Sequence, residues 1–301
     1  MKQFDLIMDN SGSRLDAWLS NSLPELSRSY IHTLITEGNV QIAGMAKIKP
    51  SLKLSEGAEI TVNVPDPEMM TVEPQEIALD IAYEDEWLLV VNKPQGMVVH
   101  PALGHKDGTL VNALLSYCQG QLSDINGVIR PGIVHRIDKD TSGLLLVVKD
   151  NIVHGKIADQ IRRHEVRRTY RTVVYGQMPA ERGTIDAPIG RDHKHRQRMA
   201  VVAEGKPSIT HFEVIERLTK ATYIEAELET GRTHQIRVHM KYAGHPVIGD
   251  PLYATGRPSY DLEGQALHAF RLSFKHPVTG RQVEVESPLP DWFKELLEKL
   301  K

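Results

Sequence analysis

The sequence lacks the features that mark secreted, membrane-bound and cysteine-rich proteins. Its 301 residues include one cysteine, Cys118, which excludes an internal disulfide and a cysteine cage for zinc. No window approaches the roughly 18 apolar residues that a membrane helix needs, and the first twenty residues lack the apolar stretch of a signal peptide. We therefore expect a cytoplasmic protein without a membrane partner.

An excess of charge of one sign is also missing, because the formal net charge is −3. The field of the whole molecule therefore does not predict a polyanion partner. Two local runs differ: "RRHEVRRTYR", residues 162–171, has five Arg against one Glu, and "RDHKHRQR", residues 191–198, has four Lys or Arg against one Asp.

Such charged runs are commonly solvated faces. Arg also binds phosphate bidentately and stacks on bases, and both runs contain His. We interpret them as segments of an RNA-binding groove. The basic residues expected to contact RNA are Arg162, Arg163, Arg167, Arg168, Arg196 and Arg198.

Length and composition predict a folded chain of about two domains. Hydrophobic residues are 41% and charged residues 25% of the sequence, which is typical of globular proteins. The segment "PDPEMMTVEPQE" holds three prolines in ten residues from Pro65 to Pro74, a composition typical of linkers. We predict a boundary near residue 75, between a small domain over residues 1–75 and a larger one over residues 76–301.

The predicted small domain begins with two short helices and continues with the strands "NVQIAG" and "AEITVNV". Ser27 is expected to cap the second helix and Gly38 to end it. The apolar stripes of the two helices are Leu15, Trp18, Leu19 and Leu23 in the first, and Ile31, Leu34 and Ile35 in the second.

This pattern resembles the small RNA-binding domain named for the fourth protein of the small ribosomal subunit. The likeness rests on "SRLDAWL", "SRSYIHTLITEGNVQIAG" and "KPSLKLSEGAEITV". The family's Val-Asn-Gly and Gly-Asp are replaced here by Ile42-Ala43-Gly44 and Gly57-Ala58. The resemblance implies that several polar and basic residues face RNA rather than being merely solvated; they are Arg14, Arg28, Ser29, Lys47, Lys49 and Lys53.

From residue 80 onward, strand-like and helix-like segments are mixed without internal repeats, which predicts an α+β domain on a mixed sheet. The segments are "WLLVVNKP", "LVNALLSY", "GLLLVVKD", "VHGKIADQIRRH", "YRTVVYG", "TYIEAELETG", "HAFRLSF" and "RQVEVES". Because "GLLLVVKD" is apolar without alternation and rich in branched residues, it is predicted to be a strand covered on both faces.

The segment "HRIDKDTSG" precedes that buried strand. If "HRID" is extended, Arg136 and Asp138 share one face while Ile137 turns into the interior. Gly143 is suited to the end of the turn, because glycine adopts a positive φ without steric cost. A polar turn that bonds its own backbone is the alternative explanation of this segment.

Two other segments add polar residues at the ends of predicted elements. In "VVNKPQGMVVHP", Lys93 ends a strand, where it could contact phosphate or extend its ammonium to solvent, and Gly96 permits a tight turn. In "GRTHQIRVHMKYAGHPVIGDPLY", Thr233 is predicted to cap a helix that Gly244 ends. The buried side of that helix is expected to carry Ile236, Met240 and Ala243.

Together these segments resemble the signature blocks of the RluA/RluD-type pseudouridine synthases over essentially the whole chain. "PGIVHRIDKDTSGLLLVVKD" matches the central block almost position by position. The resemblance implies a catalytic domain on a mixed, largely antiparallel sheet. It also implies an isomerase that rejoins uracil to ribose through carbon in folded RNA, with no cofactor.

The resemblance also implies roles for particular residues. Asp138 would be the catalytic carboxylate, acting as nucleophile or as base toward a ribose proton. Arg237 would be its bidentate partner, Tyr170 would stack on uracil, and Arg136 would fill the space that the extruded base leaves. His135 and Lys93 complete the expected substrate-binding set.

Two other classes of function fit some of these residues. A metal hydrolase would use His135, His234, His239 and His245, but a spacing of five between His234 and His239 does not suit two ligands on one helical face. We therefore expect no metal. A non-catalytic RNA-binding or ribosome-assembly protein would explain the basic residues without requiring a directed Asp138.

The favoured RNA partner is large-subunit ribosomal RNA, with transfer RNA as the alternative for the same chemistry. The C-terminal "WFKELLEKL" places Trp292, Leu296, Leu297 and Leu300 at helical spacing. Such a stripe docks more often on its own core than on a partner, so a monomer is expected.

Overall fold

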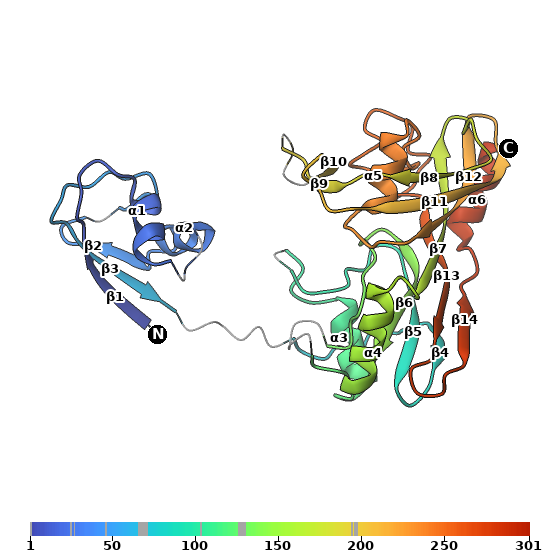
Figure 1. Cartoon of the computed structure of the whole chain (residues 1–301), viewed down its shortest axis with the longest axis horizontal. Helices are drawn as coiled ribbons and strands as arrows, with labels where there is room; N and C mark the ends of the chain where they lie inside the picture. Colours follow the sequence, from blue (N-terminus) through green and yellow to red (C-terminus); the bar gives the residue numbers. More distant parts are fainter. Residues whose placement is uncertain are drawn as a thin grey trace. The chain divides into compact units, whose positions relative to one another are not determined.

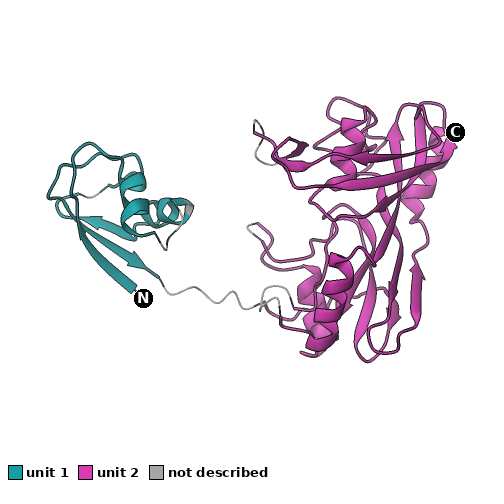
Figure 2. Ribbon diagram, in the orientation of Figure 1, with its two compact units in different colours: residues 1–70 teal, residues 71–301 magenta. Residues whose placement is uncertain are grey.

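The structure is a computed structural model that describes residues 2–24, 26, 28–45, 47–65, 72–102, 104–125, 131–193, 195 and 198–301. The chain divides into two compact units, residues 1–70 and 71–301 (Figure 2). In the described ranges, no helix is long and apolar enough to cross a membrane. Ser27 and Arg196, and the side chain of Ser29, lie outside the described residues.

The first unit is a three-stranded antiparallel sheet with two helices. The strand order is β1 (Lys2–Ile7), β3 (Glu59–Val64), β2 (Val40–Ile42), and the helices are α1 (Leu15–Ser22) and α2 (Arg28–Thr36). Both predicted apolar stripes are buried in one cluster, and Gly38 follows α2 with φ +79°, as expected. Strand β1 was not predicted; it is an edge strand in which Phe4 and Leu6 turn toward the core.

The second unit is built on one nine-stranded sheet (Figure 1). Its order is β4–β5–β6–β13–β7–β12–β11–β8, with β14 paired to β13. β6 and β13 are parallel and the other pairs found among the described residues are antiparallel, so the mixed, largely antiparallel α+β fold is confirmed. The strands are β4 (Ile81–Glu84), β5 (Leu88–Lys93), β6 (Ser142–Val148), β7 (Arg167–Tyr175), β8 (Arg182–Asp186), β11 (Ile209–Arg217), β12 (Ala221–Leu228), β13 (Leu267–Lys275) and β14 (Gln282–Glu286).

Strand β6 is buried along its whole length, as its uninterrupted apolar run predicts. Residues Leu145 and Val147 pack in the same cluster as helix α3 (Leu110–Tyr117). Leu144 and Leu146 pack instead with helix α4 (Asn151–Arg162). Because neighbours in a strand point to opposite faces, the two helices cover opposite sides of β6. The loop that precedes β6 is therefore attached to a strand buried on both faces.

Helix α5 (Gln235–Tyr242) and helix α6 (Asp291–Leu300) complete the second unit, with the small hairpin β9 (Ile189–Arg191) and β10 (Met199–Val201). Phe293, Leu296 and Leu300 of α6 are 5% exposed or less and belong to the main core cluster. The prediction that the C-terminal stripe docks on its own core is confirmed.

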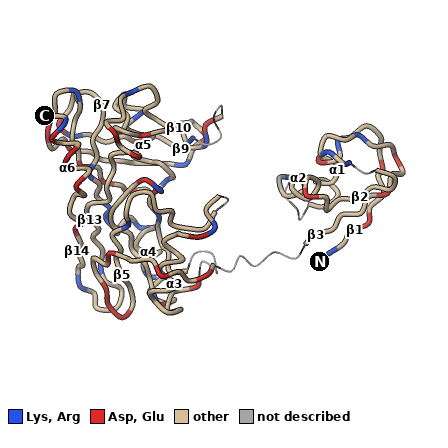
Figure 3. The backbone as a smooth tube through the Cα atoms, turned by 180° about the vertical axis from the view of Figure 1, so that it is seen from behind, with Lys and Arg blue, Asp and Glu red and all other residues tan. Residues whose placement is uncertain are grey.

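The strands absent from the predicted segments are β4, β8, β9, β10 and β11. Their side chains are largely half-buried or exposed, so no apolar run marks them. Lys and Arg are interspersed with Asp and Glu along both units, in keeping with the small net charge (Figure 3).

The segment after residue 71 packs on the second unit, although its prolines suggested a linker as far as residue 75. Val72 and Leu79 contact the main core. The Gln75 amide donates to the Asn112 carbonyl at 3.0 Å, and Asn112 Nδ2 donates to the Glu73 carbonyl at 2.8 Å. These bonds explain why the division falls at residues 70 and 71.

Candidate active site

The first residues of β6, directly after the loop, are held against β13 by an approach that only glycine permits. Gly143 has φ +107°, and a Cβ atom at this position would lie 2.3 Å from the carbonyl oxygen of Ala269. The two residues are register partners in the parallel β6–β13 pair. The positive φ expected of Gly143 is confirmed, and it serves strand pairing as well as the turn.

Lys93 is buried and binds backbone carbonyl groups, including one of the loop before β6. The expectation that it contacts phosphate or extends to solvent is therefore corrected. The side chain is 0% exposed. Its Nζ donates to the carbonyl oxygens of Pro94 at 2.7 Å, Met97 at 2.9 Å and Lys139 at 2.9 Å. Burial lowers the pKa of Lys93 to about 7, against the raising effect of Asp140 and Asp138. Lys93 is a structural anchor because the turn after β5 folds over its ammonium group.

His135 also holds the backbone in place. Its Nε2 accepts a hydrogen bond from the Leu146 amide at 2.9 Å, while Nδ1 finds no partner in the described part of the chain. Burial, together with the charge of Arg168, lowers the pKa of His135 to about 3, so the ring is neutral at pH 7. His135 lines the cavity described below, but its accepting nitrogen is occupied by β6.

The "HRID" segment has the alternation that its sequence predicts. Ile137 is 5% exposed, whereas Arg136 is exposed and the carboxylate of Asp138 is 19% exposed. Arg136 and Asp138 both line a cavity of about 430 Å³. The predicted shared face of the two charged residues is therefore confirmed, and that face opens into the cavity.

Arg237 contacts Asp138 across 99 positions of sequence, with Nη1 donating to Oδ2 at 2.8 Å. The expected bidentate geometry is wrong for this pair, because it is made to a second carboxylate. Nε and Nη2 donate to Asp250 at 2.7 and 3.0 Å. Burial alone would lower the pKa of Arg237, but the hydrogen bond to Asp250 and the charges of both carboxylates raise it.

Asp250 was not among the predicted site residues. Its side chain is 0% exposed, and Oδ1 also accepts from the amides of Leu252 and Tyr253 at 2.9 and 3.0 Å. The "GDP" tripeptide signals a turn, but no local pattern predicts that this turn faces Arg237. Asp250 fixes the far edge of the guanidinium, which leaves Nη1 directed at Asp138.

Helix α5 begins differently from the prediction. Its N-cap is His234, with left-handed backbone angles (φ 57°, ψ 23°), and not Thr233. The side chain of Gln235 closes the preceding loop by accepting from the Arg232 amide at 2.9 Å and the Thr230 hydroxyl at 2.8 Å. Ile236 and Met240 are buried as expected, but Ala243 is exposed, because α5 ends at Tyr242 and position 243 is the surface cap.

The unusual backbone of His234 brings its ring to the catalytic carboxylate candidate. Nε2 lies 3.9 Å from Asp138 Oδ1, and Nδ1 lies 2.9 Å from the Tyr253 hydroxyl. That hydroxyl accepts from the Met199 amide at 2.9 Å, and its own proton is available to Nδ1. Donation to Nδ1 would place the ring proton on Nε2, on the side of Asp138. Burial lowers the pKa of His234, partly offset by Asp138. His234 was considered only as a metal ligand, and Tyr253 was not predicted in the site.

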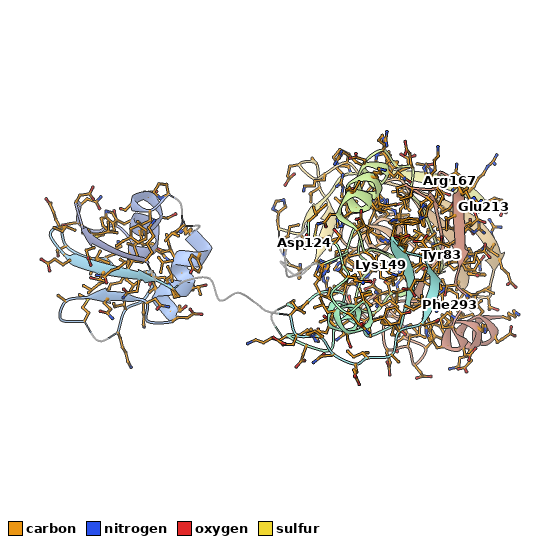
Figure 4. The ribbon with its side chains drawn as sticks, turned by 90° about the horizontal axis from the view of Figure 1, so that it is seen from below. Tyr83, Asp124, Lys149, Arg167, Glu213 and Phe293 are labelled. Atoms are coloured by element: carbon orange, nitrogen blue, oxygen red, sulfur yellow. The ribbon has the colours of Figure 1, made fainter. Side chains whose placement is uncertain are left out.

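Strand β7 contributes Tyr170 to the cavity wall, and with it Arg168. Tyr170 is 6% exposed, and burial raises the pKa of its hydroxyl. Arg168 was expected on the RNA-binding surface, but it is 6% exposed and lines the cavity. Residues two apart in a strand share a face, so Arg168 follows Tyr170 inward. Arg167, labelled in Figure 4, is exposed.

Three other Arg residues of the basic runs, Arg162, Arg163 and Arg198, are less buried than Arg168. Arg162 lines the cavity with a side chain 75% exposed, and it pairs with Asp159 at 2.6 Å. Arg163, 65% exposed, pairs with Glu165 at 3.4 Å. Arg198 is half-buried, and its backbone closes a turn with Asp192.

In the first unit, the Arg and Lys residues expected to face RNA are exposed. Lys47 and Lys49 project from the surface. Arg14 and Arg28 are 50% and 59% exposed, and both donate to Asp16 at 3.0 Å. The hydrogen bond from Arg14, opposed by burial, lowers the pKa of Asp16 to about 2.

No group of three or more His, Cys, Asp or Glu that could hold a metal is found among the residues that the structure describes. His239 faces the Thr210 hydroxyl and the Ala187 carbonyl through its two ring nitrogens. His245 faces the Tyr175 carbonyl. These two histidines therefore bond away from His135 and His234.

Comparison with known proteins gives matches over most of the chain. Residues 87–242 match the family described as RNA pseudouridylate synthase. An uncharacterized RNA pseudouridine synthase of Bacillus subtilis, YlyB, is 50% identical over 303 residues, which cover 100% of this chain and 99% of that protein. The ribosomal large subunit pseudouridine synthase D of Zymomonas mobilis is 46% identical, over 96% of this chain and 94% of that protein. Among solved structures, human RNA pseudouridylate synthase domain containing 1 superposes with a TM-score of 0.58 and 27% identity, over 78% of this chain and 97% of that one.

Proposed function

The chain belongs to the RNA pseudouridylate synthase family, and from this premise we propose that it isomerises uridine to pseudouridine in large-subunit ribosomal RNA. It is an isomerase, since the reaction rearranges one nucleoside of an RNA. The choice of RNA is supported by relatives named for the large ribosomal subunit, including synthase D of Zymomonas mobilis and of Pseudomonas aeruginosa, 46% and 43% identical.

The reaction exchanges one bond to ribose for another. The bond between N1 of uracil and C1′ of ribose breaks, and a bond forms between C5 and C1′. A proton leaves C5 and another is gained at N1, so atoms and charge balance without an oxidant or a group donor. The protein must therefore open the glycosidic bond, retain the detached base and let it turn.

The observation that carries the proposal is a carboxylate held by a buried cation at the wall of a cavity. We propose Asp138 as the catalytic residue, either as nucleophile at C1′ or as base toward a neighbouring ribose proton. Its ion pair with Arg237 at 2.8 Å holds the carboxylate in one direction at the cavity wall. Asp250 supports this role by fixing the direction of the guanidinium.

Two other cavity residues fit the need to extract the target nucleotide from a stacked RNA. Flipping a nucleotide costs a few kcal/mol. Arg136 is exposed on the same face as Asp138, which suits it to fill the vacated stack. Tyr170 supplies an apolar ring inside the cavity, which suits it to stack on uracil.

The first unit is proposed to be an RNA-binding domain joined to the catalytic domain. Its support is the helix-helix-strand pattern and four exposed cations, Arg14, Arg28, Lys47 and Lys49. Asp16 neutralises part of the charge of the two Arg residues. Removal of residues 1–70 is expected to weaken RNA binding while leaving a catalytic unit with its own core.

We further propose a monomer in the cytoplasm. The apolar face of α6 packs in the core of its own unit and is not available to a partner, which supports a single subunit. Sedimentation equilibrium would check the mass, and cell fractionation would check the location.

Substitution of the proposed catalytic carboxylate tests the activity. Asp138→Ala is expected to abolish pseudouridine formation on ribosomal RNA transcripts while RNA affinity is retained within about twofold. The matched control is Asp261→Asn, whose carboxylate is 94% exposed. Pseudouridine formed at an undiminished rate by Asp138→Ala would leave only the non-catalytic RNA-binding role.

Mapping of pseudouridines in cells that lack the gene tests the substrate. Loss of one or a few sites in large-subunit ribosomal RNA is expected, with return on expression of the wild type but not of Asp138→Ala. Loss confined to transfer RNA would redirect the same chemistry to that substrate.

A further inference from the structure

Arg168 is a buried cation that the proposed chemistry does not yet use. Its side chain lies in strand β7, 6% exposed, on the wall of the cavity that holds Asp138. In the part of the chain that the structure describes, it makes no ion pair and one long hydrogen bond, from Nη2 to the Glu229 carbonyl at 3.4 Å. Its Nε is buried without a partner there.

Such a group is costly unless something binds it. A buried charge without a counter-charge or a full set of acceptors loses its solvation by water without compensation. Burial lowers the pKa of Arg168, yet a guanidinium stays charged in proteins. The surroundings also keep room for it, because a Cβ at Gly231 would lie 2.6 Å from Nη1. The donors of Arg168 are therefore available for a ligand in the cavity.

The depth of Arg168 indicates which part of a nucleotide meets it. RNA phosphates belong to a continuous backbone that stays at the mouth of a cavity, where the exposed Arg136 and Arg162 lie. A flipped base enters deepest. Arg168 and Tyr170 are two residues apart on one face of a strand, a separation of about 7 Å. If uracil stacks on Tyr170 with its sugar toward Asp138, the far edge of the ring reaches Arg168.

We infer that Arg168 determines base specificity by donating hydrogen bonds to a carbonyl oxygen of uracil beside N3. This inference deepens the proposed function and rests on it. The far edge of uracil carries O2, N3–H and O4, so a donor placed beside N3 meets an acceptor. A cytosine turned with its amino group to Arg168 would set donor against donor, as would an adenine amino group.

The symmetry of uracil gives this contact a second consequence. Rotation of the detached base by half a turn about the axis through N3 and C6 exchanges N1 with C5, which is the exchange the isomerisation requires. The same rotation exchanges O2 with O4. Arg168 would therefore hold a carbonyl oxygen both before and after the turn, and it would keep the free base in the cavity between the two bonds.

Thionucleoside substrates test the inference at the level of single atoms. A short RNA with one target uridine is compared with the same RNA carrying 2-thiouridine or 4-thiouridine, because sulfur is the weaker acceptor. Single-turnover rates are measured for the wild type, Arg168→Met and Arg168→Lys. The matched control is Arg281→Met, an exposed Arg in the turn between β13 and β14.

We expect Arg168→Met to slow uridine conversion by about 10- to 100-fold, the equivalent of one lost hydrogen bond to a charged group. Its rates on uridine and on both thiouridines are expected to become equal within about twofold, whereas the wild type and Arg281→Met discriminate against sulfur at both positions. Arg168→Lys, which keeps the charge, is expected to fold and to lose part of the discrimination.

Three results would overturn the inference. Discrimination against sulfur that is unchanged in both Arg168 variants would remove the contact. Weaker RNA binding with a salt slope lower by about one, at unchanged discrimination, would make Arg168 a phosphate ligand. A wild-type protein that forms no pseudouridine in any RNA would remove the proposed function and this inference together, whereas the first two results leave the proposed function standing.

Discussion

Replacement of Asp250 by Asn tests whether a second carboxylate orients Asp138, the proposed catalytic carboxylate. Asp250 and Arg237 form a buried pair with two hydrogen bonds, at 2.7 and 3.0 Å, and Arg237 makes its third bond to Asp138. Asn keeps the size of Asp and an oxygen for the amides of Leu252 and Tyr253. It removes the negative charge and places an N–H₂ group against the guanidinium.

The size of the effect follows from the burial of the pair. The side chains of Arg237 and Asp250 are 5% and 0% exposed. Removal of one partner from a buried ion pair costs about 3–5 kcal/mol, and Asp138 as remaining counter-charge brings the expected loss toward the lower figure. The guanidinium is then free to turn toward Asp138. A displacement of about 1 Å at a reacting group costs about 100-fold in rate.

The assay measures both quantities on one preparation. Urea unfolding gives the free energy of unfolding, and single-turnover pseudouridine formation gives the rate. We expect a loss of about 3 kcal/mol and of about 100-fold for Asp250→Asn. Asp261→Asn is the matched control, because Asp261 is 94% exposed and Asn tolerates its φ of +64°. No change beyond about 0.5 kcal/mol or twofold in rate is expected for the control.

A wild-type rate for Asp250→Asn, measured where the variant is fully folded, would refute the reasoning. It would mean that Asp138 alone directs Arg237. A stability loss with an unchanged rate would leave Asp250 as a packing residue and separate the two effects.

Two further predictions concern the frame around the site. Gly143→Ala is expected to lower the free energy of unfolding by more than about 3 kcal/mol, because φ +107° is strained for Ala and its Cβ would lie 2.3 Å from the Ala269 carbonyl oxygen. The control Gly155→Ala, in open space within α4, should instead stabilise the protein by up to about 1 kcal/mol. Equal effects of the two substitutions in urea unfolding would contradict this prediction. The pKa of His135 is lowered to about 3 in the folded state, so between pH 3 and about 6.5 the unfolded chain binds one more proton than the folded one. The free energy of unfolding should therefore fall by up to about 1.4 kcal/mol for each pH unit of acidification in that window. His135→Gln should make the free energy of unfolding less dependent on pH there, and an equally steep dependence would count against the neutral ring.

Local sequence patterns predict much of the frame. The uninterrupted apolar run of β6 requires cover on both faces, and α3 and α4 supply it. Alternation in "HRID" directs Arg136 and Asp138 outward and Ile137 inward. The partner of Asp138 came from resemblance to a known family, since no local rule connects positions 138 and 237.

The same patterns mislead where charge is concerned. A run of Arg residues reads as a solvated surface, yet the alternation of β7 sends Arg168 into the cavity beside Tyr170. Lys93 is predicted at the end of a strand, yet its ammonium group is surrounded by the Pro94 and Met97 carbonyls of the next turn and by the Lys139 carbonyl. In both cases a prediction from residue type was wrong, because the direction of the side chain decides whether a charged residue is exposed.

The buried strands, the turn glycines and the face that carries Asp138 follow from local sequence, because they depend on periodicity and on backbone angles within a few residues. The surroundings of that carboxylate depend instead on how distant segments pack. Arg237 meets Asp138 across 99 positions and Asp250 across 13, and each pair depends on how separate elements pack. Buried charged groups are stabilised by ion pairs and hydrogen bonds with residues that are close in space. Local patterns of residue types do not predict those partners when they are distant in sequence.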